Sequence, residues 1–191
     1  MKNFVFALLL GLLLFVLPSC SGESVAAEVN GEAITYAQLE QARSMADLQG
    51  SIAGAEALLT PEELLDQAIT YLLISQECRR LGISTSYEDA LAETRADYRL
   101  VEIAAAGSGA DALAAQKTVD FFEAFAAKKG LTVDEYFRQY AAEARRKSMD
   151  AIALKEWLAE QFPDVEFSQY LQQLSDQAEI KRQDEPAGRG D

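Results

Sequence analysis

Apolar residues recur at helical spacing along most of the chain and predict a mainly α-helical protein. The clearest run follows residue 60, where one face carries Leu65, Ala68, Ile69, Leu72 and Leu73 and the opposite face carries Tyr71, Ile74 and Cys78. Intervals of three and four residues are those of a helix face. Because a helix that is apolar all round must be covered on all sides, we expect this helix to lie at the centre of the fold.

Capping signals divide the helical pattern into separate segments. Three threonines are followed three residues later by a side chain that completes a capping box: Thr35 with Gln38, Thr60 with Glu63, and Thr132 with Glu135. Glycine and proline mark the ends of the segments. The pattern predicts helices over residues 36–48 and ending near Gly50, 61–81, 87 to about 106, 110–129, 133–161, and a short sixth around 167–174.

Short strand signals stand near the two ends of the chain. Val25–Val29 is apolar-rich and is followed by Asn30-Gly31, the strongest two-residue hairpin signal. A second brief strand is predicted at 178–181. The last nine residues, 183–191, are polar and contain proline and glycine, so we expect a disordered tail.

The first 19 residues have the layout of an export signal. Lys2 precedes an apolar run from Phe4 to Leu17, which is shorter than the roughly 20 residues needed to cross a bilayer. The sequence Leu-Pro-Ser-Cys at 17–20 resembles the lipobox of bacterial lipoproteins, although that motif usually has a small residue where Pro18 stands. The resemblance implies cleavage before Cys20, lipidation of Cys20 and a short tether over 20–24; the alternative is an ordinary secretory peptide with an incidental cysteine.

Composition favours one globular domain and disfavours anionic partners. The chain carries a formal net charge of −14, which repels nucleic-acid phosphates and anionic headgroups, so membrane contact should be limited to the lipid anchor. Its 49% hydrophobic content and its length are enough for a single core, which we place over residues 25–182.

The residues needed for common catalytic and metal sites are missing from the chain or isolated in it. The sequence contains no histidine, and its cysteines, Cys20 and Cys78, are too few for a thiolate zinc site. Paired acids such as 62–63 and 134–135 fall in first helical turns, where they complement the helix dipole. Ser75 and Ser148 have no candidate base beyond lysine or carboxylate. We therefore expect a protein without catalytic activity, metal or cofactor, in which Cys78 is a buried free thiol.

Two sets of aromatic residues flank the turn at Gly130. They are Phe121, Phe122 and Phe125 before the turn, and Tyr136, Phe137 and Tyr140 after it. An antiparallel helix pair would bring the sets together. One account is mutual packing at the hairpin tip; the other is that some rings stay exposed and bind apolar segments of client proteins.

Several motifs resemble the N-terminal module of the SurA, PrsA and PpiD family of extracytoplasmic chaperones and foldases. Val29-Asn30-Gly31-Glu32 with Ile34-Thr35 matches the strand, turn and first helix of that module. The segment 64–84 resembles its long central helix, and 128–140 resembles its later hairpin. The resemblance covers most of 28–161 and implies a multi-helix chaperone domain. It also implies that the strand at 178–181 pairs beside Val25–Val29.

Members of this family commonly carry a parvulin-type prolyl isomerase domain, and here fewer than 30 residues follow Pro163. The resemblance therefore implies a membrane-anchored holdase outside the cytoplasm that binds unfolded or newly exported polypeptides. The alternative is an assembly lipoprotein that holds one folded partner, and a prolyl isomerase is a distant third.

Overall fold

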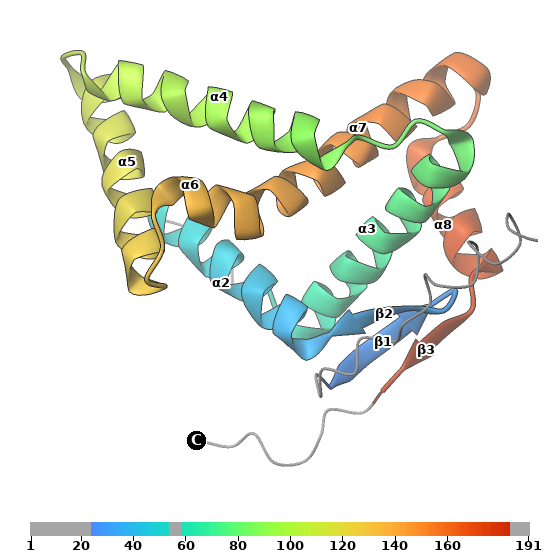
Figure 1. Cartoon of the computed structure of the whole chain (residues 1–191). Helices are drawn as coiled ribbons and strands as arrows, with labels where there is room; N and C mark the ends of the chain where they lie inside the picture. Colours follow the sequence, from blue (N-terminus) through green and yellow to red (C-terminus); the bar gives the residue numbers. More distant parts are fainter. Residues whose placement is uncertain (1–23, 54–58, 184–191) are drawn as a thin grey trace, which may run out of the picture.

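A computed structural model describes residues 24–53 and 59–183 (Figure 1). Its elements are β1 (Val25–Val29), β2 (Glu32–Thr35), α2 (Tyr36–Ala53), α3 (Pro61–Leu81), α4 (Tyr87–Ala105), α5 (Ala110–Lys128), α6 (Val133–Tyr136), the π-helix η1 (Phe137–Ala141), α7 (Ala142–Gln161), α8 (Phe167–Gln177) and β3 (Ile180–Arg182). Helices account for 74% of these residues, so the predicted mainly α fold is confirmed. The predicted signal peptide, the lipidation site at Cys20 and residues 184–191 of the tail lie outside the described residues.

The two ends of the domain meet in one small antiparallel sheet of order β2-β1-β3. Asn30 and Gly31 both have positive φ, 51° and 85°, as the tight turn between β1 and β2 requires. On the other edge of β1, Val29 pairs with Ile180 and Ala27 with Arg182. The pairing of the N- and C-terminal strands is confirmed, with β3 starting two residues later than the predicted 178.

Side chains at the hairpin turn hold the sheet on the central helix. The Asn30 Nδ2 group donates to Gln76 Oε1 at 2.7 Å, while Asn30 Oδ1 accepts from the Glu179 amide at 2.9 Å. Gln76 also donates to the Val29 carbonyl at 2.9 Å. One asparagine therefore links β1, the approach to β3 and α3.

The predicted caps fix most helix boundaries. The Thr60 hydroxyl accepts from the Glu63 amide at 3.2 Å, and the Glu63 carboxylate accepts from the Thr60 amide at 2.7 Å. Gly82 ends α3 in the left-handed conformation, with φ 73°. The first predicted helix was expected to end near Gly50, and this was wrong: Gly50 lies inside α2, where glycine costs only about 1 kcal/mol relative to alanine.

Helix α3 is central, as predicted, because it contributes to two of the apolar clusters formed by the described residues. Its first half packs on the sheet through Ile69 and Leu73, and its second half packs on α7 and α8 through Ile74 and Cys78. A further cluster around Tyr136 lies at the α5–α6 end. Figure 1 shows the α4–α5 hairpin at the end of the molecule away from the sheet, with α4 running alongside α7.

A buried aspartate on α7 ties three parts of the chain together. Asp150 has no exposed surface and accepts from Ser75 Oγ at 3.1 Å, from the Thr85 amide at 2.7 Å and from Arg146 Nη1 at 3.1 Å. Arg146 in turn forms two hydrogen bonds with Glu143. Since each Asp150 oxygen is satisfied, the charge is tolerated in the core and fixes α7 against α3 and the α3–α4 loop.

The predicted continuous helix over 133–161 contains one departure from α geometry. Phe137–Ala141 forms a π-helical turn between α6 and α7, and Tyr87 Oη donates to the Arg138 carbonyl within it. A π-turn holds more residues than an α-turn, so it changes the direction in which later side chains point. Within the described residues, no helix has both the length and the apolar character that a bilayer crossing needs.

Candidate functional site

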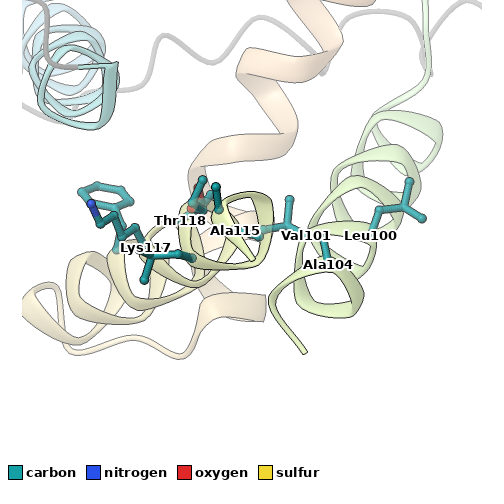
Figure 2. A pocket seen from close by; sticks show the side chains of 10 residues that line it. Leu100, Val101, Ala104, Ala115, Lys117 and Thr118 are labelled. Carbon is teal, nitrogen blue, oxygen red and sulfur yellow. The ribbon is translucent and has the colours of Figure 1, made fainter. Parts of the chain in front are cut away.

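An open apolar groove runs between α4 and α5 at the hairpin end, with a volume of about 820 Å³ (Figure 2). Helix α4 lines it with Leu100, Val101 and Ala104. Helix α5 lines it with Ala110, Leu113, Ala114, Ala115, Lys117, Thr118 and Phe121. Apart from Lys117 and Thr118, the lining side chains are apolar, and four of them are alanine. The groove therefore has a floor of small residues between larger apolar walls.

Three large aliphatic side chains at this hairpin are strongly exposed. Leu100, Ile103 and Leu113 are 65%, 63% and 61% exposed, and the first and third belong to the groove lining. A single exposed leucine is ordinary, but several beside an apolar groove are typical of a binding surface.

The turn between the helices explains how the two walls come to face the groove. Gly109 has φ 101°, a conformation that residues with a Cβ atom rarely adopt. At Gly107 a Cβ atom would stand 3.1 Å from the Ala104 carbonyl oxygen. These two glycines allow α5 to return tightly along α4, which places the ends of both helices side by side.

Helix α5 uses separate stripes for packing and for the groove. Ala112, Val119 and Ala126 are buried at intervals of seven residues. The lining residues Leu113, Lys117 and Phe121 form another stripe at intervals of four residues. Because the first stripe already serves the contacts of α5 within the domain, the second is left open to solvent.

Charge at the groove is limited to one lysine. Lys117 is the charged residue of the lining, and it forms no ion pair with the described residues. Nearby, Asp120 accepts from Gln116 at 2.7 Å. On α4, Asp97 is paired with Arg145 at 2.9 Å. The groove thus presents one cation on a protein whose overall charge is strongly negative.

The six aromatic residues singled out in the sequence pack mainly on one another. Tyr136 and Phe137 are 1% and 3% exposed, and Phe122, Phe125 and Tyr140 surround them. Tyr98 of α4, which the sequence reasoning missed, meets Phe137 edge to face at a centroid distance of 5.1 Å. Burial raises the pKa of Tyr136 to about 12. Mutual packing therefore describes the arrangement of these five rings.

Phe121 is the member of that set that lines the groove. Phe121 also stacks on Phe125 at a centroid distance of 5.9 Å. Lys129 Nζ lies 5.4 Å from the Phe125 ring centroid and 5.1 Å from that of Tyr140, a cation–π arrangement with both rings. The exposed residues Leu100, Ile103 and Leu113 were not predicted. Their sequence neighbours one turn away include alanines, as at Ala104 and Ala110, so apolar periodicity alone does not separate them from core positions.

The buried polar side chains of the described residues contact one another within the core. Ser75 Oγ donates to the Asp150 carboxylate, which also accepts from the Thr85 amide and from Arg146. Burial is the main cause that raises the pKa of the Cys78 thiol to about 12. Cys78 is a buried free thiol, as expected. Within residues 24–53 and 59–183, no cluster of three or more acidic, cysteine or histidine side chains is suited to hold a metal ion.

Comparison of the chain with family models, curated proteins and solved structures gave no match. The groove geometry is therefore the observation from which a function can be argued.

Proposed function

We propose that the protein is a bacterial extracytoplasmic chaperone of the holdase type, anchored to the membrane by a lipid on Cys20. It binds apolar segments of unfolded or newly exported polypeptides and carries out no covalent chemistry. The supporting observation is the apolar groove between α4 and α5 with the exposed Leu100, Ile103 and Leu113 beside it. The resemblance of the N-terminal motifs to the SurA, PrsA and PpiD family is consistent with this function.

The expected affinity is modest and suits reversible binding. Full burial of a leucine or isoleucine is worth about 1.5–3 kcal/mol, so side chains that are roughly two-thirds exposed can gain about 1–2 kcal/mol each from a client. Three of them supply about 3–6 kcal/mol, and the client's own buried apolar side chains add a comparable amount, from which an association cost of about 4 kcal/mol or more is subtracted. Clients bound this weakly leave without an energy source.

The first test is suppression of aggregation by an anchor-free form, which consists of residues 20–191 with Cys20→Ser. We expect this form to keep a chemically denatured model protein soluble when present in excess. Loss of protection is expected for the double variant Leu100→Gln, Leu113→Gln, in which both walls become polar while helix propensity is kept. Both side chains are mostly exposed, so the melting temperature should stay within about 2 °C.

The matched control is Ile152→Gln on α7, because Ile152 is 55% exposed and lies outside the groove lining. Equal protection by the anchor-free form and this control is expected. If the double variant protects as well as the control does, the groove is not the client site.

Two further measurements test the anchor and the range of partners. Mass spectrometry of the mature N-terminus should show acylated Cys20, and an unmodified cysteine would remove the membrane tether from the proposal. Crosslinking in membranes should capture many exported proteins. A single dominant folded partner would favour the scaffold alternative instead.

A further inference from the structure

We infer that the segment held in the groove is one amphipathic α-helix with a basic polar face. The inference rests on the proposed function and specifies the form and charge of its ligand. It follows from the backbone of the groove walls, the shape of the floor, the size of the groove and the charge of the protein.

The walls of the groove offer a ligand almost no backbone hydrogen bonds. Both walls are α-helices, whose amide and carbonyl groups are paired within each helix except at the ends. An extended peptide would therefore find backbone partners only at the hairpin end, where α4 ends at Ala105 and α5 begins at Ala110, whereas a helix brings its own along its whole length. Helical ligands that lay an apolar face into a groove between helices are an established mode of peptide recognition.

The shape of the groove calls for large side chains from the ligand. Ala104, Ala110 and Ala114 leave space between Leu100 on one side and Phe121 on the other. A ligand helix fills such a space with large apolar residues at positions i, i+3 or i+4, and i+7. The lining of α5 extends from residue 110 to residue 121, about 18 Å at 1.5 Å per residue, which matches a ligand helix of about three turns.

The size of the groove disfavours a second copy of the protein as the occupant. The groove lining runs for about 18 Å along α5 and about 7.5 Å along α4, so at a helix width of about 10 Å the two helices present a face of roughly 255 Å². A stable interface buries about 800 Å² on each partner. In addition, two copies would each bring a formal net charge of −14, and their mutual repulsion opposes association.

The same charge selects among helical ligands. The negative field attracts a helix whose polar face carries lysine or arginine and repels an acidic one, and added salt weakens both effects. Lys117 is the local exception, since its ammonium group lies in the lining and opposes a basic ligand. Reversing this charge should therefore strengthen binding, an effect opposite to that of most binding-site substitutions.

Three labelled peptides of 18 residues test the inference by fluorescence anisotropy with the anchor-free form. The first is a basic amphipathic helix, the second has the same composition in an order without an apolar face, and the third replaces each basic residue with glutamate. We expect the first to bind at least tenfold more tightly than the other two and to gain helical circular dichroism when bound. Raising the salt concentration from 50 to 300 mM should weaken it several-fold.

Protein variants show whether binding takes place in the groove. Ala114→Phe fills the floor and should weaken the basic helix about tenfold, since Ala114 is exposed and the substitution leaves the core intact. Lys117→Glu should strengthen binding about threefold or more at low salt, from removal of one repulsion and addition of one attraction. Lys155→Glu makes the same charge change at an exposed position of α7 and should have a smaller effect.

Each outcome decides one of the two proposals. Equal binding of the amphipathic and reordered peptides, absence of induced helix, or no binding of any peptide would overturn the helical ligand. Equal effects of Lys117→Glu and Lys155→Glu, or no effect of Ala114→Phe, would place the peptide outside the groove. If aggregation suppression still depends on Leu100 and Leu113 in those cases, the proposed holdase stands and this inference alone fails.

Discussion

The substitution Asp150→Ala should destabilise the protein more than any change at the surface of α7. It leaves Ser75 Oγ and the Thr85 amide without their buried acceptor, and it removes one of the two carboxylates that bind Arg146. Breaking a buried ion pair by removing one partner costs about 3–5 kcal/mol. Because Arg146 keeps its two hydrogen bonds to Glu143, we place the loss at about 3 kcal/mol.

Thermal unfolding followed by circular dichroism measures this loss. For a domain of this size, about 3 kcal/mol corresponds to a decrease of roughly 6–12 °C in the melting temperature. Asp150→Asn keeps the volume and one acceptor oxygen, so its decrease should be smaller. The control is Arg145→Met, which removes exposed ion pairs with Glu93 and Asp97 and should cost at most about 1 kcal/mol. A decrease below about 2 °C for Asp150→Ala would show that the aspartate does not hold α7 in place.

Three further predictions concern acid sensitivity, thiol reactivity and helix capping. The hydrogen bond from Arg80 is the main cause that holds the pKa of the Glu77 carboxyl below its ordinary value. As the pH drops below about 4.3, Glu77 is protonated in the unfolded chain before it is protonated in the folded one, so the free energy of unfolding falls. Urea unfolding between pH 3 and 6 should show a shallower fall for Glu77→Gln than for the unchanged protein, and equal slopes would contradict this prediction. Cys78 is buried and its pKa is raised to about 12, so iodoacetamide at pH 8 should leave the native anchor-free form unmodified. In urea the same reagent should label Cys78 fully. Rapid labelling of the native form would show that the thiol is accessible. In urea titrations, Thr60→Ala should lower the free energy of unfolding by about 1 kcal/mol because it removes the N-cap of α3. The control Thr70→Ala removes only a hydrogen bond to the Asp66 carbonyl one turn back, so it should leave the free energy of unfolding nearly unchanged.

Local signals predicted the helix boundaries because the capping interactions lie within a few residues of one another. The boxes at Thr60 and Thr132 form as the spacing indicates, and Gly82 and Gly130 have positive φ at the predicted ends. The π-turn at 137–141 was not predictable in this way. The turn packs against α4, and Tyr87 at the start of α4 donates a hydrogen bond to the Arg138 carbonyl within it. Residues 51 positions apart carry no local signal for each other.

Of the six predicted client-binding residues only Phe121 belongs to the groove lining, for a related reason. Aromatic residues on both sides of a turn indicate a contact, but the sequence does not show which rings the contact covers. Tyr98, 23 residues before Phe121, packs against Phe137 and helps to bury it. The groove lies instead between α4 and α5, and Phe121 is the residue of the predicted aromatic set that lines it. Exposure is a property of the assembled helices, so it could be found only once their arrangement was known.

The pairing of β1 with β3 has a consequence for the order in which the protein matures. Val29 is among the first residues of the domain to be synthesised, yet its partner Ile180 is among the last. Until then one edge of β1 carries unpaired amide and carbonyl groups, and such an edge can pair with another chain. Contacts of such long sequence separation also form slowly. The nascent domain therefore passes through a stage in which its helices can form while its sheet is incomplete, and a chain that stops before residue 180 stays at that stage.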